Sequence, residues 1–418
     1  MKHDILEIIK QCFSHLPDHD NRAKISPRSF LIALIFLMTK DSGRKTIAGM
    51  RRAMIGTTAK KIARSSFWLR ISSKRLTLLL CSVMVNLINQ GKYAKGIAPV
   101  LLKKLKVKGI FLVDSSVIVL NEKAASAFPT PKNNGPAAIK WHLCLNLLTA
   151  LPRWFTLTDG TINEHNEFPP LAKFRGALFI FDLGYWDYRR LLQIIEEKCF
   201  FLSRIMPRSK IEIIGYAGKY LKKSKKALFK GNLFDFDWSK KRGRIVELLG
   251  SIKLGQSREG SFNIRVIGFW NPSKNCYHWY VTNLTIHAKL IYPLYRLRWQ
   301  VELTFKAAKS TLSLAEIPSG NEYAIRNIFL ASAIAHLIAQ FALRAELNPS
   351  VQAEREAVST QRIAIIFIHV AKSFYDFLVI NTSKSYFALR KILKTYASEI
   401  IDPNFLNRQT SWHRMCIS

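Results

Sequence analysis

Two short stretches of the chain, GIFLVD at residues 109–114 and ALFIFD at residues 177–182, share one pattern. Each is an apolar run of strand length that closes on an aspartate, Asp114 in the first and Asp182 in the second. A carboxylate is costly among buried apolar residues, so each aspartate is expected where its strand reaches the surface. If the two strands are neighbours, the carboxylates lie close enough to share a divalent metal ion. Taken singly, either aspartate would be interpreted as capping the turn after its strand.

The sequence around these stretches predicts an α/β fold. Runs rich in apolar, β-branched and aromatic residues alternate with helical patterns, and turn-forming residues separate them. Three strands are predicted at residues 109–120, 140–150 and 153–160, followed by a helical stretch through Leu171. A strand at 176–182, a helix from Tyr188 and a strand from Phe200 come next. This order is that of an RNase H-like core.

The rest of the chain divides by its pattern into helical and strand-like regions. Residues 1–95 are basic and amphipathic at helical spacing, and the run 44–56 is a weak candidate for a helix-turn-helix, with plain helical packing as the alternative. The expected domains are a helical N-terminal domain that binds DNA ends, an RNase H-like catalytic core, a β-rich insertion and a helical C-terminal region suited to dimerisation, at residues 1–95, 96–206 with 288–320, 207–287, and 321–418.

A third carboxylate lies in the run YPLYRLRWQVELTFKAAKS at residues 292–310. Tyr295, Arg298, Glu302 and Lys309 are spaced by three, four and seven residues there, which predicts one face of an α-helix. Three carboxylates could hold two metal ions, one activating a water or a 3′-hydroxyl and the other stabilising the leaving oxygen at a phosphodiester. The competing acids are interpreted as supporting or structural residues, namely Asp159, Glu164, Glu167 and Asp187.

The charge balance favours a polyanionic partner. The chain carries 64 Lys and Arg against 28 Asp and Glu, a net charge of +36 spread over its whole length. A compact protein with that excess repels itself unless an anion neutralises it, and nucleic acid is the expected partner. A membrane surface or a ribosome is the alternative that composition alone leaves open.

The cysteines and the apolar runs indicate a cytoplasmic protein without membrane spans. The six cysteines are far apart and form no zinc-binding pattern, so free thiols in a reducing compartment are expected. The start, MKHDILEIIKQCF, lacks the pattern of a targeting segment. The apolar runs 30–38 and 328–343 are predicted to be buried core helices.

The motifs together resemble a known family. DSS at Asp114, DLGYWDY at Asp182 and the spacing of Tyr295, Arg298, Glu302 and Lys309 resemble the DDE transposases of the insertion-sequence four family, whose last motif is called YREK. The resemblance covers the chain from about residue 21 to the C-terminal helices.

The resemblance implies a fold, a chemistry and roles for single residues. It implies an RNase H-like core interrupted by a β-strand insertion, and Asp114, Asp182 and Glu302 as the catalytic triad binding two magnesium ions, with manganese as a substitute. The implied activity is cut-and-paste excision of an insertion sequence through hairpin ends, followed by strand transfer. The implied partners are the terminal inverted repeats and target DNA, bound by a homodimer in the bacterial cytoplasm and on the nucleoid.

The same resemblance implies the contacts with DNA. Tyr295, Arg298 and Lys309 would contact the phosphates and the flipped base near the transposon end. Trp279 or Trp238 from the insertion would hold a flipped base, although a tryptophan in a strand-rich region is more often a core residue. Leu183 departs from relatives that often have a polar or basic residue after the second aspartate.

Two other functions fit the same residues. One is a DNA-binding protein derived from a transposase whose metal site has decayed, and the other is a host nuclease with the same core. All three carboxylates and their YREK neighbours are present, so the sequence gives no sign of decay.

Overall fold

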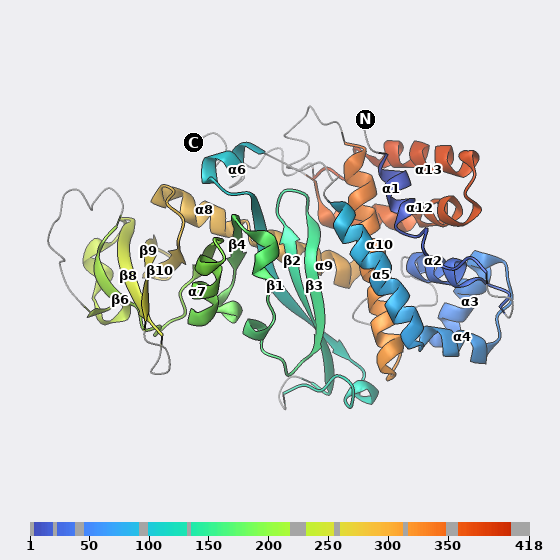
Figure 1. The fold of residues 1–418 in the computed structure, drawn as a ribbon, viewed down its shortest axis with the longest axis horizontal. Helices are drawn as coiled ribbons and strands as arrows, with labels where there is room; N and C mark the ends of the chain where they lie inside the picture. Colours follow the sequence, from blue (N-terminus) through green and yellow to red (C-terminus); the bar gives the residue numbers. More distant parts are fainter. Residues whose placement is uncertain are drawn as a thin grey trace.

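The structure is a computed structural model with a mixed α/β architecture, built on one sheet of ten strands. It describes residues 4–19, 23–37, 46–91, 99–131, 135–217, 231–254, 260–311, 317–347 and 358–402. In Figure 1 the strands of the predicted insertion lie on the left, the first five strands lie in the middle and most of the helices lie on the right.

The first five strands form half of the sheet in the order β3-β2-β1-β4-β5. Neighbouring strands are antiparallel between β3, β2 and β1, and parallel between β1, β4 and β5. These strands are β1 (Gly109–Leu120), β2 (Ala137–Asn146), β3 (Leu151–Asp159), β4 (Ala177–Phe181) and β5 (Phe200–Arg204). The predicted strands are therefore present, and the two that lead to the aspartates are direct neighbours.

The prediction of a helical stretch through Leu171 is wrong. Two short 3-10 helices, η3 (Glu164–Asn166) and η4 (Leu171–Phe174), occupy that part of the chain, and Pro169 and Pro170 lie between them. Two consecutive prolines cannot donate backbone hydrogen bonds and clash with a preceding helical turn, so the chain does not continue as an α-helix. The helix predicted from Tyr188 is present as α7 (Tyr188–Glu196).

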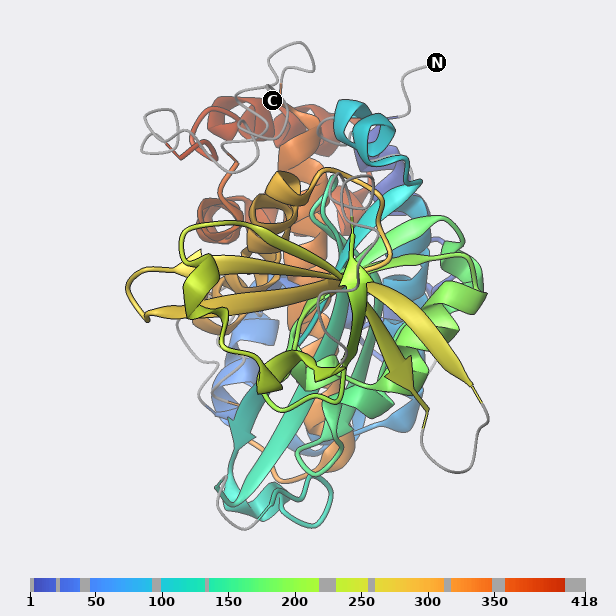
Figure 2. The ribbon, with the colours of Figure 1, turned by 90° about the vertical axis from the view of Figure 1, so that its left-hand side faces the viewer.

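The strands predicted between residues 207 and 287 extend the same sheet. β10 pairs antiparallel with β5, Tyr280 opposite Arg204, and the order continues β10-β9-β8-β6-β7. The strands are β6 (Glu212–Tyr216), β7 (Gly231–Asn232), β8 (Val246–Lys253), β9 (Ser261–Asn271) and β10 (Cys276–Thr282). Figure 2 shows β8 to β10 crossing in front of the first strands, so the sheet twists strongly between its two halves. The basic run before Gly231 lies outside the described residues.

Most helices lie on one side of the first sheet half, where α5 and α10 contact the sheet and the others pack around these two. The N-terminal helices are α1 (Ile5–Gln11), α2 (Pro27–Leu37), α3 (Ile47–Thr58), α4 (Arg64–Ile71), α5 (Lys74–Gln90) and α6 (Pro99–Leu105). The C-terminal helices are α10 (Glu322–Ala345), α12 (Thr360–Ile380) and α13 (Ser383–Tyr396). The side chain of Asn327 in α10 donates to the backbone oxygens of Ile71 and Ser73, at 2.9 and 3.1 Å. The two ends of the chain thus share one hydrophobic core.

The run 44–56 does not hold two helices. Residues 47–58 form the single helix α3, and the turn follows at Ala59, which has a left-handed backbone with φ of 54°. A helix-turn-helix would therefore have to consist of α3 and α4, and Arg44 and Lys45 lie outside the described residues.

The strands that carry the aspartates are buried on both faces of the sheet. Ile110, Leu112 and their neighbours in β4 pack toward the long helices, whereas Phe111 and Val113 pack toward α7 on the other face. Parallel strands covered on both sides need apolar residues at every position, which explains the continuous runs GIFLV and ALFIF.

Two helices are long and apolar enough to cross a membrane by length and composition, α10 and α12, and the bent pair α4 and α5 would make a third span. Within α10, 89% of the apolar window is buried inside the protein, against 56% in α12. The predictions that residues 328–343 and the described part of 30–38 form buried core helices are confirmed. Five cysteines are free thiols, Cys12, Cys81, Cys144, Cys199 and Cys276, and Cys416 lies outside the described residues.

Candidate active site

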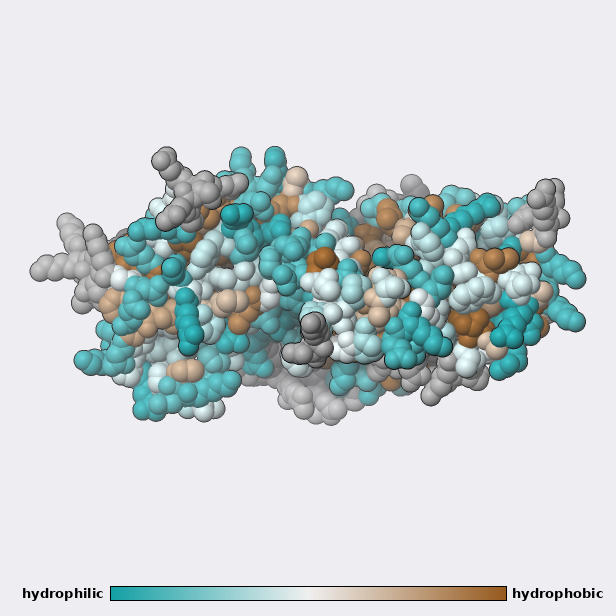
Figure 3. Space-filling model, turned by 90° about the horizontal axis from the view of Figure 1, so that it is seen from below, coloured by the Kyte–Doolittle hydropathy of each residue, from teal (hydrophilic) through white to brown (hydrophobic). Residues whose placement is uncertain are grey.

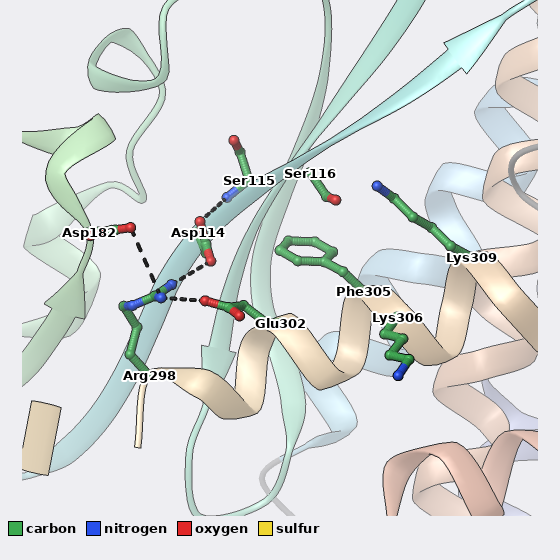
Figure 4. A pocket seen from close by; sticks show the side chains of 9 residues that line it. All are labelled: Asp114, Ser115, Ser116, Asp182, Arg298, Glu302, Phe305, Lys306 and Lys309. Atoms are coloured by element: carbon green, nitrogen blue, oxygen red, sulfur yellow. Dashed lines mark hydrogen bonds and ion pairs between the residues drawn. The ribbon is translucent and has the colours of Figure 1, made fainter. Parts of the chain in front are cut away.

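The two aspartates lie next to the last paired residues of β1 and β4, Val113 and Phe181. Asp182 directly follows β4, as expected. The expectation that Asp114 ends its strand is wrong, because β1 continues to Leu120 and Asp114 is still paired with Leu143 of β2. Both aspartates line one pocket of about 640 Å³. The pocket is lined by Asp114, Ser115, Ser116, Asp182, Arg298, Glu302, Phe305, Lys306 and Lys309, all drawn in Figure 4.

The third carboxylate reaches the pocket from α9 (Trp299–Thr311). Val301, Phe305 and Ala308 form the buried stripe of this helix, and the Phe305 ring packs edge-on against Trp141 of β2 at 5.1 Å between centroids. Glu302 lies one position beyond Val301 and therefore faces the pocket. It is also in the first turn of α9, where the helix dipole favours a negative charge.

The prediction of one continuous helix through all four YREK positions is wrong. Tyr295 lies in α8 (Ile291–Arg296), a turn follows at residues 297–298, and α9 begins at Trp299. The amide of Arg298 bonds to the carbonyl of Tyr295 and its own carbonyl accepts from Val301, both i to i+3 bonds. This tighter turn brings Arg298 over the carboxylates.

Arg298 lies at the centre of the three carboxylates. Its Nη1 donates to Oδ2 of Asp114 at 2.7 Å, and its Nη2 donates to Oε1 of Glu302 and lies 4.0 Å from Oδ2 of Asp182. Only 13% of the Arg298 side chain is exposed, and 15% of the Asp114 side chain. One cation thus offsets the repulsion of three acids in a partly dehydrated site, as the dashed lines in Figure 4 show.

Two further hydrogen bonds orient the aspartates. The hydroxyl of Tyr295 donates to Oδ1 of Asp182 at 3.0 Å, and the amide of Ser115 donates to Oδ1 of Asp114 at 2.8 Å. Tyr295 therefore contacts a carboxylate of the site.

Burial dominates the electrostatics of the site. It raises the pKa of Asp114 to about 6, against the opposing effect of Arg298 and the amide of Ser115. Burial also raises the pKa of Tyr295, and the nearby Asp182 raises it further. Burial alone would lower the pKa of Arg298, but Asp114, Tyr295 and the other two carboxylates raise it. Arg298 therefore stays charged.

The lysines of the pocket are farther from the carboxylates. The ammonium group of Lys309 donates to the carbonyl of Val117 in β1 at 2.6 Å, and burial lowers its pKa. Lys306, one turn after Glu302, also lines the pocket, as do Ser115, Ser116 and Phe305. The serines belong to the DSS motif at Asp114, but the sequence assigned no role to any of these four residues, although Lys306 stands at the i+4 position from Glu302.

Trp279 and Trp238 lie in the insertion, away from the residues that line this pocket. Trp279 is buried, with 6% of it exposed, stacks on Tyr277 at 5.3 Å and meets Trp238 edge-on at 5.0 Å. The contact of either ring with a flipped base stays a prediction, and Trp279 would have to leave this cluster to make it.

The donor set of the site suits a hard divalent cation, because three carboxylates supply only oxygen ligands. Among the residues that the structure describes, no three of His, Cys, Asp or Glu are grouped closely enough to hold a metal ion. The guanidinium of Arg298 fills the space between the carboxylates. Coordination by Asp114, Asp182 and Glu302 together therefore requires Arg298 to withdraw.

Comparison with known proteins adds to this geometry. A family model described as Transposase DDE domain matches residues 105–338, more than half of the chain. The chain belongs to the transposase DDE domain family. The match includes Asp114, Asp182, Glu302 and the insertion strands. The narrower insertion-sequence four relationship stays a prediction.

Two individual proteins are also similar to this member of the family. A Sinorhizobium fredii protein described as a transposase, y4zB, is 26% identical over 238 residues, which is 56% of this chain and 60% of that protein. The chain thus spans less than two thirds of the length of this curated relative. A cryo-EM structure of the piggyBac transposase synaptic complex with hairpin DNA has a TM-score of 0.42 and 9% identity, over 96% of this chain and 85% of that one.

The raised pKa of Asp114 predicts a pH dependence of stability. Its folded-state pKa of about 6 lies above the ordinary 3.8, so ionisation costs the folded state free energy. The stabilisation is fully present below about pH 4 and is lost as the pH rises through about 6. Asp114→Asn should therefore raise the free energy of unfolding at neutral pH by on the order of 2 kcal/mol.

Urea denaturation between about pH 4 and pH 8 measures this difference. Glu122→Gln, which changes an exposed carboxyl, is the control and should leave the curve unchanged. A lower stability of Asp114→Asn at neutral pH would contradict the prediction.

Proposed function

We propose that the protein is a DNA transposase that excises a DNA segment and joins it to target DNA, using divalent metal ions bound by Asp114, Asp182 and Glu302. The observation that carries the proposal is the convergence of three carboxylates from β1, β4 and α9 on one open pocket in a member of the transposase DDE domain family. A chain with 28 acids and 64 basic residues has few carboxylates to spare, and three of them meet here.

Magnesium or manganese, two ions when fully loaded, would activate the attacking water or 3′-hydroxyl and stabilise the leaving oxygen. The chain's own residues do the rest. Asp114 lies in β1, Asp182 directly follows the parallel neighbour β4, and Glu302 is held by a helix packed on the same sheet. Tyr295 keeps Asp182 turned into the pocket through its hydroxyl.

The cations of the pocket are suited to the scissile phosphate. Arg298 offers a planar fork that fits a phosphate as well as a carboxylate, so it can exchange one for the other. Lys306 and Lys309 lie farther along α9 and extend the positive charge in the direction a DNA strand would follow. This supports the YREK assignment, in which Tyr295, Arg298 and Lys309 contact the transposon end.

The proposed core is RNase H-like. The strand order β3-β2-β1-β4-β5 supports this assignment, since β2 is antiparallel to both β3 and β1, and β4 and β5 run parallel to β1. Strands β6 to β10 would then be the insertion before Glu302. A homodimer that holds two terminal repeats together, in the bacterial cytoplasm and on the nucleoid, completes the proposal.

The N-terminal helices are the proposed binding site for the DNA ends. Residues 42–113 contain 16 Lys and Arg and no Asp or Glu. A groove of about 700 Å³ between α3 and α4 is lined by Arg51, Arg64, Trp68 and four smaller or apolar neighbours. Trp68 is 38% exposed and lines the same groove as the two arginines. Seen from below, hydrophilic side chains cover most of the surface, and apolar ones appear as scattered patches at both ends (Figure 3).

The alternatives predict different reactions. A transposase-derived protein without catalysis would bind DNA but cut nothing, and the complete triad in one pocket disfavours it. A host nuclease would cut DNA without joining it. Supplying pre-cut DNA ends with an intact target plasmid separates the nuclease from the transposase. Of these two, the transposase is the one that joins the ends to the target.

The triad makes a direct prediction. Asp114→Ala, Asp182→Ala and Glu302→Ala should each reduce magnesium-dependent cleavage of a plasmid carrying the gene with its flanking DNA by about 1,000-fold or more. DNA binding, measured in a gel-shift assay, should persist because the basic surfaces are unchanged. Glu122→Ala is the control with wild-type cleavage. Normal cleavage by any one triad variant would remove that residue from the mechanism.

The position of Arg298 predicts competition with metal. In the absence of DNA, Arg298→Ala should raise the affinity for manganese by about tenfold, because no guanidinium then competes for the carboxylates. Isothermal titration calorimetry measures the affinity. Arg296→Ala is the matched control, since Arg296 is exposed over the Tyr292 ring and forms no ion pair with the triad among the described residues. Unchanged or weaker binding by Arg298→Ala would refute the competition.

The groove between α3 and α4 makes a separate prediction. Arg64→Ala should weaken binding to duplex DNA and lower the slope of log affinity against log salt by about 0.9, one phosphate contact. Trp68→Ala should weaken binding without changing that slope. Fluorescence anisotropy measures both. Arg175→Ala removes the same charge from an ion pair with Glu197 and should change neither; equal effects of Arg64→Ala and Arg175→Ala would exclude the groove as the contact.

A further inference from the structure

A fourth carboxylate, Glu164, lies against residues that neighbour the two aspartates, Ser115 and Gly184. It is in η3, in the connection between β3 and β4, and its Oε1 accepts a hydrogen bond from the hydroxyl of Ser115 at 2.5 Å. The amide of the same serine donates to Asp114. Ser115 therefore links Glu164 to Asp114, with one hydrogen bond from its hydroxyl and one from its amide.

The other carboxylate oxygen of Glu164 touches the segment that carries the second aspartate. Gly184 follows Asp182 by two residues, in η5 (Leu183–Tyr185). A β-carbon added to Gly184 would lie 1.7 Å from Oε2 of Glu164 and 2.9 Å from its carboxyl carbon. No side chain fits at position 184 while Glu164 stays in place, so this glycine is required by a close approach and not by its backbone angles.

The segment around Glu164 is held from both sides. The ammonium group of Lys140 in β2 donates to the carbonyl of Ile162 at 2.7 Å, and the guanidinium of Arg190 in α7 donates to the carbonyl of His165 at 3.2 Å. Two cations thus fix the backbone on either side of Glu164, yet neither pairs with its carboxylate. Glu164 forms no ion pair with any residue in the described part of the chain.

This arrangement is costly unless it has a use. Glu164 adds a negative charge one residue from Asp114 and two residues from Asp182, and among the described residues it forms no ion pair. A neutral residue would accept the serine hydroxyl equally well. What a carboxylate offers here is two oxygens on one rigid plane, with one against β1 and one against η5.

We propose that Glu164 is a positioning residue that sets the separation of Asp114 and Asp182 by bridging Ser115 and Gly184. The inference rests on the proposed function, because the separation matters only if the two aspartates share metal. Parallel pairing aligns β1 with β4 as far as Val113 and Phe181, but no pairing between these two strands extends to the aspartates, although Asp114 is still paired with Leu143 of β2. Glu164 provides the missing link between them.

The test is a set of variants measured for manganese binding by calorimetry and for manganese-dependent DNA nicking. Glu164→Ala should weaken manganese binding by about tenfold and should raise the manganese concentration for half-maximal nicking, with the rate at saturating metal largely restored. Glu164→Gln keeps the planar group and should stay within about twofold of wild type. Glu167→Gln, which removes the same charge three residues along the chain, is the matched control and should bind manganese normally.

Gly184→Ala supplies an independent arm. It should weaken manganese binding in the wild-type background because the new methyl group displaces Glu164. In the Glu164→Ala background the same substitution should have little further effect, so the two changes are strongly non-additive. Unfolding by urea, measured on all variants, separates lost positioning from lost folding.

The outcomes distinguish the inference from the function on which it rests. If the wild-type protein binds manganese and nicks DNA, but the effects of Gly184→Ala and Glu164→Ala are additive, the positioning role is overturned and the proposed transposase function is not. Equal losses in Glu164→Gln and Glu164→Ala would also overturn it, since charge and not position would then be responsible. Absence of manganese binding and of nicking in the wild-type protein would overturn both.

Discussion

Three carboxylates held together in a half-buried pocket repel one another, and the rest of the site is arranged around that repulsion. In this structure the guanidinium of Arg298 offsets it, bonded to Asp114 and Glu302 and 4.0 Å from Asp182. Burial still raises the pKa of Asp114 to about 6, so the single cation does not compensate fully for the loss of water around this carboxyl group. Additional positive charge would stabilise such a site. Divalent metal ions would supply this charge, and a DNA phosphate would become the new partner of Arg298.

The sheet determines where the repulsion is concentrated. β1 and β4 are parallel neighbours, so Asp182 at the end of β4 lies next to Asp114 in the middle of β1, and apolar layers on both faces cover the two strands. Glu302 reaches their pocket from a helix whose buried stripe packs on Trp141 of β2. The N-terminal and C-terminal helices close the same core, which ties the proposed DNA-binding helices to the platform of the active site.

Much of this arrangement was predictable from the sequence, because its signals are local and strong. Continuous apolar runs up to Asp114 and Asp182 predict buried strands, and the pattern around them predicts the succession of strands along the chain. Two features were missed for physical reasons. The prolines at 169 and 170 end any helix before β4, and the turn at residues 297–298 divides the YREK segment, although the spacing of its residues suits one helix. Helical spacing does not reveal a local switch from i+4 to i+3 hydrogen bonds.

The roles of Glu164 and Arg298 depend on contacts between distant parts of the chain, which no local pattern encodes. The replacement of Arg298 by metal between the carboxylates is tested most directly by the anomalous diffraction of manganese in a crystal of the protein bound to DNA. We expect manganese between Asp114, Asp182 and Glu302, with Arg298 turned away from the carboxylates and bonded to a DNA phosphate. Manganese bound elsewhere, or Arg298 still bridging Asp114 and Glu302 beside the DNA, would contradict this expectation.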